Sequence, residues 1–368
     1  GNVVIDDANV DGTSASFSVD ASAMSGTIHV KGGNTSVAST ITGGSGADTL
    51  VGGSVADTIT GGAGADKITT NAGNDTVTGG DGADAITAGA GDNVITGGAG
   101  NDTIISGSGF DNIDAGAGDD TITLAANMSL SDTVAGGAGN DTITATLSSG
   151  SDSQKVGTLS GVENFTLDFA QSTGSFDSAN ATTAAYTVTN AADDFHIDMD
   201  ALATGSTVKI TASGDSIALD YADDATASIT FDDNGGGADF DFDETMAVTD
   251  AQTVNLNFEG GQEALITGAI TLDATDTDYV TITADASGSD LHADGAFAAA
   301  AVSTFSLVST DGGIIDFDST GLAAAASLTT FSASTTGGAD AADISFGSFV
   351  VGNNAAAAKL TSIDLDAS

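Results

Sequence analysis

The sequence predicts an all-β chain, with a parallel β-roll over residues 43–147 and a further β-solenoid or β-sandwich region over residues 148–368. Nine consecutive nonapeptides run from Gly43 to Thr123 without an insertion or deletion, and each carries an aliphatic eighth residue. Outside the repeat, apolar and polar residues alternate with a period of two, as in strands with one buried face. Proline, which would remove a ladder hydrogen bond, is absent from all 368 residues.

Residues 1–42 precede the repeat and include the strand-like segment FSVDASAMSGTIHVKGG. Its apolar residues alternate with polar ones in short runs, which is typical of strands. We expect this segment to lead into the roll or to cap it.

The complete nonapeptide reads GGxGxD, followed by any residue, an aliphatic residue and any residue. Complete copies begin at Gly43, Gly61, Gly79, Gly97 and Gly136, and weaker copies begin at residues 52, 70, 88, 106, 115 and 127. The aliphatic eighth positions are rich in β-branched residues, which suit a buried strand face, and are Leu50, Ile59, Ile68, Val77, Ile86, Ile95, Ile104, Ile113, Ile122, Val134 and Ile143. Alternating loops and strands with this spacing predict a two-sided solenoid with a narrow aliphatic core.

The recurring glycine and aspartate positions of the nonapeptide suit the binding of a cation. Glycine permits positive φ and close backbone approach, so carbonyl oxygens can converge without an intervening Cβ. The sixth-position carboxylate adds a hard anionic oxygen, and such ligands suit Ca²⁺ better than zinc or copper. A disordered Gly/Ser/Asp linker is the alternative reading of this composition, but a linker has no reason to keep an aliphatic residue every nine positions.

These residues resemble the RTX, or hemolysin-type, nonapeptide repeat, a calcium-binding β-helix signature. The resemblance implies that two nonapeptides form one coil and that several Ca²⁺ ions lie between equivalent turns of successive coils. The implied carboxylate ligands are Asp48, Asp57, Asp66, Asp75, Asp84, Asp102, Asp111, Asp120, Asp132 and Asp141, with Asn93 at the same position of a weaker copy. The implied turn glycines are Gly43, Gly44, Gly46, Gly61, Gly62, Gly64, Gly79, Gly80, Gly82, Gly97, Gly98, Gly100, Gly116, Gly118, Gly136 and Gly137.

The better copies lie eighteen residues apart, at 43, 61, 79 and 97, and therefore fall on one edge of a roll with two nonapeptides per coil. We predict near-full calcium occupancy on that edge and lower occupancy on the other. There Val55 replaces a glycine, and Thr70, Ala88 and Ser106 replace the first glycine. A measured ion count with both edges equally filled would contradict this gradient.

Residues 148–368 carry a longer and looser repeat. An apolar pattern of the form Φ-x-x-Φ-x-Φ occurs at Val162/Phe165/Leu167, Ala192/Phe195/Ile197, Val302/Phe305/Leu307, Leu328/Phe331/Ala333 and Leu360/Ile363/Leu365. Spacings of roughly 25 to 32 residues among the later copies suit irregular rungs of a parallel β-solenoid. An antiparallel sandwich is the alternative, because alternation alone does not fix strand pairing. Short alanine runs at 298–301, 323–326 and 355–358 are the only segments with helical character.

The charge is strongly one-sided, with 52 acidic residues against five lysines and no arginine, for a net charge of −47. Self-repulsion of this size opposes compaction unless counterions or bound metal offset it. Nucleic acid is excluded as a partner, since binding it requires basic contacts, and an anionic membrane surface is disfavoured for the same reason.

Cysteine is absent, which excludes disulfides and thiolate chemistry. No run of about 18 apolar residues is present, so membrane insertion is not expected.

Nothing in the sequence predicts an enzyme. The three histidines, His29, His196 and His292, form no HExxH motif, and GDSIA at Gly214 lacks the second glycine of a serine-nucleophile elbow. His196 alternates with Asp198 and Asp200, which indicates a solvated strand face. Paired carboxylates at 193/194, 223/224 and 232/233 are expected in turns, with extra surface calcium sites as the alternative and Asp239, Asp241 and Asp243 as the best candidates. A two-carboxylate glycosidase stays open on residue types, although three tyrosines and no tryptophan leave few aromatics for sugar stacking.

Composition and the loose rungs, including GVENFTL, resemble those of bacterial surface-layer proteins, in which a calcium-stiffened roll precedes Thr/Ser/Ala/Asp-rich β domains. This resemblance implies a secreted structural protein at the surface of a Gram-negative bacterium, exported by type I secretion, with copies of itself as partners and a cell-surface glycan as anchor. The alternatives are a fragment of a large RTX adhesin and the non-catalytic RTX part of a secreted hydrolase. The chain shows no Sec-type signal, and we expect a mature product or a piece of a longer polypeptide.

Overall fold

The computed structural model describes most of the repeat region and the strands of the remaining chain. The described residues are 3–6, 16–32, 37–124, 132–146, 158–169, 176–178, 181, 184–189, 196–211, 216–232, 240–242, 246–259, 263–266, 270–272, 277, 279–284, 290–293, 297–299, 302–310, 314–317, 322–324, 330–336, 343–346, 349–351 and 362–367. Among these residues there are 36 strands and no helix. The chain divides into two compact units, of which unit 1 comprises residues 1–147, 154–166 and 180–182, and unit 2 comprises the rest.

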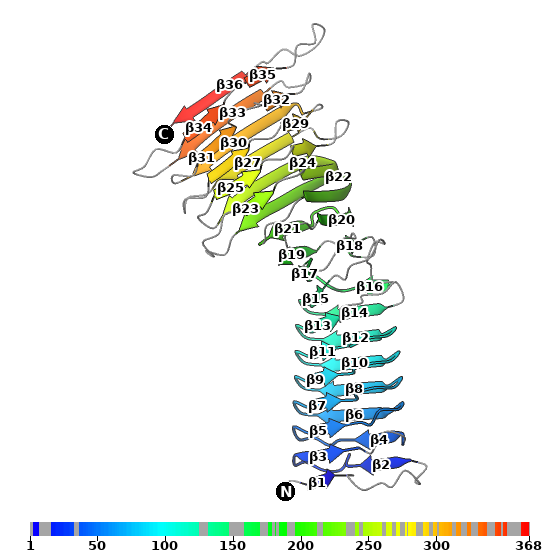
Figure 1. The fold of residues 1–368 in the computed structure, drawn as a ribbon. Helices are drawn as coiled ribbons and strands as arrows, with labels where there is room; N and C mark the ends of the chain where they lie inside the picture. The colour runs from blue at the N-terminus through cyan, green and yellow to red at the C-terminus, as the bar shows by residue number, and fades with distance from the viewer. Residues whose placement is uncertain are drawn as a thin grey trace. The chain divides into compact units, whose positions relative to one another are not determined.

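Unit 1 is a parallel β-roll with two ladders of strands (Figure 1). One ladder contains β2 (Phe17–Asp20), β4 (Ser39–Thr42), β6 (Thr58–Ala63), β8 (Thr76–Asp81), β10 (Val94–Ala99), β12 (Asn112–Ala117), β14 (Thr133–Ala138) and β16 (Thr158–Ser160). The other contains β1 (Val3–Asp6), β3 (Ile28–Lys31), β5 (Thr49–Val51), β7 (Lys67–Thr69), β9 (Ala85–Thr87), β11 (Thr103–Ile105), β13 (Thr121–Leu124) and β15 (Thr142–Thr146). Strands of the segment before residue 43 continue both ladders, since β4 pairs with β6 and β3 pairs with β5.

The core of the roll is built from the predicted eighth positions. Along one ladder Ile59 pairs in register with Val77, Ile95 and Ile113, and every eighth-position side chain is at most 1% exposed. Full burial of a Val, Leu or Ile side chain contributes about 1.5–3 kcal/mol relative to exposure. The β-roll predicted from the nonapeptide period is therefore confirmed.

Unit 2 is a parallel β-solenoid whose later coils contain three strands each. Its strands are β18 (Phe176–Asp177), β19 (Ala185–Thr189), β20 (His196–Leu202), β21 (Thr207–Ile210), β22 (Ser216–Asp232), β23 (Phe240–Phe242), β24 (Met246–Glu259), β25 (Glu263–Ile266), β26 (Ile270–Leu272), β27 (Tyr279–Ala284), β28 (Asp290–Ala293), β29 (Phe297–Ala299), β30 (Thr304–Thr310), β31 (Ile314–Phe317), β32 (Leu322–Ala324), β33 (Thr330–Thr336), β34 (Asp343–Phe346), β35 (Phe349–Val351) and β36 (Ser362–Ala367), and β17 (Asn164–Asp168) has residues in both units. The three later ladders are β26–β29–β32–β35, β27–β30–β33–β36 and β23–β25–β28–β31–β34.

The described strands pair in parallel, as in the pairs β24–β27, β27–β30 and β30–β33. The antiparallel sandwich, the alternative considered for residues 148–368, is therefore wrong for the described strands. The first two alanine runs begin in strands β29 and β32 rather than in helices. The third run lies outside the described residues.

The predicted long-period rungs pair as the pattern aligns them. Phe305 pairs with Phe331 and Phe331 with Ile363, while Leu307 pairs with Ala333 and Ala333 with Leu365. The rings of Phe305 and Phe331 stack, with centroids 6.2 Å apart. Such aromatic stacking adds to the area burial that holds successive coils together. The rung residues Ala192, Phe195, Leu328 and Leu360 lie outside the described residues.

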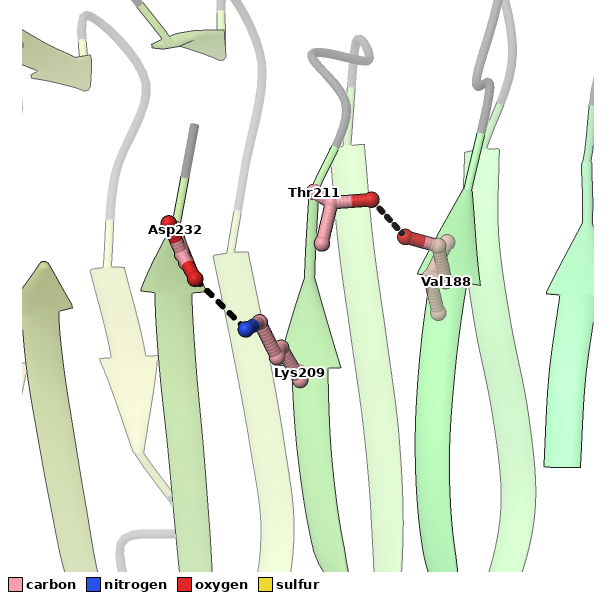
Figure 2. A network of polar contacts seen from close by, with 4 residues as sticks. All are labelled: Val188, Lys209, Thr211 and Asp232. Carbon is pink, nitrogen blue, oxygen red and sulfur yellow. Dashed lines mark hydrogen bonds and ion pairs between the residues drawn. The ribbon is translucent and has the colours of Figure 1, made fainter. Parts of the chain in front are cut away.

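Polar contacts between coils supplement this core (Figure 2). The Lys209 ammonium on β21 pairs with the Asp232 carboxylate at the end of β22 at 2.5 Å, and the Thr211 hydroxyl donates to the Val188 carbonyl at 2.9 Å. The ion pair is partly exposed, so it contributes little stability, at most about 1 kcal/mol. Packing in this unit therefore comes mainly from the apolar rungs.

Candidate metal centres along the edges of the roll

The turns of the roll form two edges, each joined by a ladder of carboxylates. On the first edge, whose hexapeptides begin at 43, 61, 79, 97, 115 and 136, the Asp48 N–H donates to Asp66 Oδ1 at 2.7 Å, and the Asp66 N–H donates to Asp84 Oδ1 at 2.8 Å. The same bond continues through Asp102 and Asp120 to Asp141. The second edge, with hexapeptides at 52, 70, 88, 106 and 127, repeats it through Asp57, Asp75, Asn93, Asp111 and Asp132. One side-chain oxygen of each sixth-position residue, a carboxylate oxygen except at Asn93, thus accepts a backbone N–H of the coil before it.

The glycines of the first edge let successive turns approach at backbone contact distance. From Gly62 onward, the second and fourth positions of this edge have positive φ, for example +121° at Gly80 and +127° at Gly82. A Cβ at Gly80 would lie 1.9 Å from the Gly62 carbonyl oxygen, which no side chain tolerates. Glycine is therefore required at this position for two reasons: other residues rarely adopt its positive φ, and the spacing of the coils leaves no room for a Cβ.

From Asp66 onward, the second carboxylate oxygen of each first-edge residue has no hydrogen-bond partner. These buried oxygens are Oδ2 of Asp66, Asp84, Asp102, Asp120 and Asp141, and Asp75 supplies a further one on the second edge. Burial raises the pKa of Asp66 to about 7 and that of Asp102 to about 6, against the opposing effect of the backbone hydrogen bonds. A buried carboxylate without a partner is costly unless it is neutralised or coordinates a metal.

At the levels of Asp66, Asp84, Asp102 and Asp141, the unpartnered oxygen faces a carbonyl oxygen of the next coil. At the Asp120 level the first position is the buried Ala115 instead of glycine. A Cβ built at Gly61 would lie 2.4 Å from Asp66 Oδ2 and 2.6 Å from the Gly79 carbonyl oxygen. The equivalent distances at Gly79 are 2.4 Å to Asp84 Oδ2 and 2.5 Å to the Gly97 carbonyl oxygen. The first-position glycine thus leaves a space that both oxygens line, and hard oxygen ligands of this kind fit Ca²⁺.

This arrangement differs from a cage of acidic side chains. Within the described part of the chain, no three Asp, Glu or His side chains gather closely enough to form such a cage. Each turn contributes a carboxylate and backbone oxygens, so a cation here would rely on main-chain ligands from two coils. Such a site is detectable only when backbone oxygens are considered together with the unpartnered carboxylates.

In the first coil of nonapeptides, backbone N–H groups of the same turns donate hydrogen bonds to the second carboxylate oxygens. The Gly44 N–H donates to Asp48 Oδ2 at 2.8 Å, and the Gly53 N–H donates to Asp57 Oδ2 at 2.6 Å. These two oxygens therefore have a partner in the protein itself, unlike those of Asp66 and the later first-edge residues. Asp48 and Asp57 as calcium ligands stay predictions.

The second edge fills the equivalent space with side chains. Thr70, Ala88 and Ser106 occupy the first position there and are at most 2% exposed. The Thr70 hydroxyl donates to the Ala88 carbonyl oxygen at 2.7 Å, the counterpart of the carbonyl that faces the space on the first edge. Burial raises the pKa of Asp75, whose Oδ2 has no hydrogen-bond partner. On the second edge, a hydroxyl thus donates a hydrogen bond to the carbonyl oxygen whose first-edge counterpart faces the space beside glycine.

Asn93 extends this substitution. Its amide Nδ2 donates to the Gly91 carbonyl at 2.9 Å and to Asp111 Oδ1 at 3.0 Å. The Asn93 amide therefore links a backbone oxygen of its own turn to a carboxylate oxygen of the next coil. This difference between the edges agrees in direction with the predicted occupancy gradient, which itself stays a prediction.

Replacing Asn93 by aspartate is expected to make the second edge dependent on calcium. Asn93→Asp removes the amide donor and places a like charge beside Asp111, so the chain at limiting calcium should lose about 1–3 kcal/mol of stability. Saturating calcium should restore it. Thermal unfolding at limiting and at saturating calcium measures both. The matched control is Asn101→Asp at an exposed fifth position, where the side-chain oxygen only accepts the Asp119 N–H. Equal loss in both variants would contradict the role of the Asn93 amide.

The structure brings the predicted glycines and aspartates of the roll together in the order implied by the repeat. Several other predicted sites cannot be placed, because Asp193, Asp194, Asp233, Asp239 and Asp243 lie outside the described residues and the side chains of Asp223, Asp224, Asp241 and His196 are likewise not described. The sequence pattern also missed Gly161 and Glu163, which follow the last nonapeptide. The Glu163 carboxylate accepts the Asp141 N–H at 2.9 Å and so continues the first-edge ladder.

Comparison with known protein families agrees with this geometry. The model of the RTX calcium-binding nonapeptide repeat matches four times, at residues 42–77, 78–113, 96–126 and 129–146. The predicted resemblance to this repeat is confirmed. RTX repeats are calcium-binding motifs, the roll they form is a structural, non-catalytic fold, and proteins that carry them are typically secreted by Gram-negative bacteria.

The match covers the roll and leaves unit 2 without a family. No curated protein and no solved structure matches the chain significantly. In the described residues, no helix has the length and apolar character needed to cross a membrane.

Proposed function

We propose that this chain, whose RTX repeats bind calcium, is an extracellular structural protein that folds on binding calcium and self-assembles into a surface layer. The observation that carries the proposal is the row of five buried, unpartnered carboxylate oxygens on the first edge, four of which face a carbonyl of the next coil. Without a cation these groups oppose stacking. With one at each level they join the coils.

The folding step follows from charge and entropy. In the absence of metal the acidic turns repel one another, and the glycine-rich chain keeps its large conformational entropy. A ligand that binds only the folded state stabilises it by mass action. The extracellular calcium concentration, on the order of millimolar, is comparable to the dissociation constants of the weaker class of protein calcium sites. The chain would thus leave the cell unfolded and become rigid outside.

A structural role is supported by the architecture of both units. The described strands form continuous parallel stacks, in which successive coils differ little and apolar side chains fill the interior. Solenoid ends expose unpaired strand edges, which favour association with further copies. The net charge of −47 makes such association depend on divalent cations. The partners proposed are other copies of this chain and a cell-surface glycan as anchor.

Electron microscopy of the surface of producing cells, with and without chelator, tests the proposal. The expected result is a regular two-dimensional lattice that dissolves in chelator and forms again when calcium is restored. Purified full chain should also form ordered sheets in calcium. Isolated fibres instead of a lattice would favour an adhesin. Catalytic activity that a single Asp or His substitution abolishes would overturn the structural role.

A further inference from the structure

The first-edge ladder does not end with the last nonapeptide. After Asp141 the next acidic residue in the ladder is Glu163, whose Oε2 accepts the Asp141 N–H at 2.9 Å. This is the bond that Asp84 makes with the Asp66 N–H, and Asp102 with the Asp84 N–H. Glu163 therefore occupies the sixth-position role for one more coil.

The backbone around Glu163 repeats the strand register and the carbonyl position of a first-edge turn. Strand β16 pairs with β14 and places Ser160 opposite Ala135, so Gly161 follows it as Gly136 follows Ala135. A Cβ at Gly136 would lie 1.9 Å from the Gly161 carbonyl oxygen and 2.7 Å from Asp141 Oδ2. These are the same two kinds of oxygen that line the space at Gly61 and Gly79.

The Asp141 carboxylate points to a ligand independently of Glu163. Its side chain is 0% exposed, and its Oδ2 has no hydrogen-bond partner. The Asn164 N–H donates to the Asp141 carbonyl at 2.9 Å, which fixes the Glu163 turn against this residue. A buried carboxylate oxygen without a hydrogen-bond partner is costly unless a cation or a proton neutralises it.

We propose that Asp141 Oδ2, the Gly161 carbonyl and the Glu163 carboxylate form a terminal calcium site that closes the first edge. The turn from Gly161 to Glu163 has a single residue, Val162, between the first-position glycine and the acid, whereas Gly136 and Asp141 are separated by four residues. Glutamate has one methylene more than aspartate, which extends the reach of its carboxylate from this shortened turn. The hard oxygen donor set suits Ca²⁺. The inference rests on the proposed calcium binding of the roll and assigns two ligands outside the nonapeptides, the Gly161 carbonyl and Glu163, to the last site of the row.

Calcium titration of the full chain by calorimetry, combined with an ion count at saturation, tests this site. In Glu163→Gln the amide oxygen still accepts the Asp141 N–H, so the turn should keep its fold while the anionic ligand is lost. We expect one ion fewer than in the wild type, or one site weakened at least about tenfold, in line with the loss of a residue that supports a metal site. Glu259→Gln, at an exposed glutamate of β24, carries the same charge change and should bind as the wild type does.

A second variant separates ligation from a general effect on folding. Asp141→Asn should lose the same ion, and the double variant should lose no more ions than either single variant. An unchanged ion count and affinity in Glu163→Gln would overturn the terminal site. Loss of several ions, or a weakened circular dichroism signal at saturating calcium, would overturn it as well, because Glu163 would then support folding of the whole roll. Wild-type protein that takes up no calcium would instead refute the proposed function together with this site.

Discussion

Removal of calcium from the full chain is expected to unfold the roll. Each site that calcium fills at a hundred times its dissociation constant stabilises the folded state by about 2.7 kcal/mol. Five such sites would supply about 13 kcal/mol, which is comparable to the whole stability of a typical domain, about 5–15 kcal/mol. Without that contribution the roll keeps its repulsive row of Asp66, Asp84, Asp102, Asp120 and Asp141.

Far-ultraviolet circular dichroism in chelator and in calcium measures this effect. We expect a large part of the β signal to disappear in chelator and to return on addition of calcium. Magnesium at the same concentration should restore little of it, because it requires a rigid octahedral shell and gives up its waters reluctantly. Limited proteolysis should place the new cleavage sites within residues 43–147. Equal spectra in chelator and calcium would contradict calcium-linked folding.

Acidification is expected to act in opposite directions with and without calcium. Burial raises the pKa of Asp66 to about 7 and that of Asp102 to about 6, from an ordinary value of 3.8. A raised folded-state pKa means that the folded form binds the proton more tightly than the unfolded form. The resulting stabilisation is complete below 3.8 and is lost as the pH rises through about 6 to 7.

Metal-free chain should therefore recover part of its β signal when the pH is lowered from 8 to about 5, because protons neutralise the buried row. This pH is above the sequence isoelectric point of about 4.1, so precipitation is limited. With calcium present, the same change should weaken binding, since a carboxylate must lose its proton to ligate the ion. A pH series of circular dichroism and calcium titrations checks both. A metal-free chain that loses further structure on acidification would show that the buried carboxylates do not govern its stability.

Much of the roll could be predicted because its signal is periodic. The aliphatic eighth positions, such as Ile59 and Ile68, alternate between the two ladders, and the glycines mark positions where a Cβ would collide with the next coil. The rungs of unit 2 were harder, because alternation fixes which residues are buried but not which strands pair. Matching the three residues of each apolar pattern across rungs nonetheless gave the register of Phe305 and Phe331.

Two features of the metal centres could not be predicted in full. The sequence showed that Thr70 and Ser106 replace glycines, but the hydrogen bond from the Thr70 hydroxyl to the Ala88 carbonyl depends on how one coil faces the next. Glu163 was missed because the nonapeptide template requires four residues between the first glycine and the acid. A shortened turn breaks that template while the stacked backbone retains the same oxygens. The paired carboxylates of unit 2 gave no usable signal in a chain with 52 acidic residues.

The carboxylate ladder gives the stack a direction. The N–H of each sixth-position residue is accepted by the acid of the coil that follows it, from Asp48 to Asp66 and finally from Asp141 to Glu163. A coil consequently becomes complete only when its C-terminal neighbour is in place, whereas its N-terminal neighbour contributes no such acceptor. Truncation at the C-terminal end therefore leaves a sixth-position N–H without its carboxylate acceptor, whereas truncation at the N-terminal end leaves a carboxylate oxygen without its N–H donor.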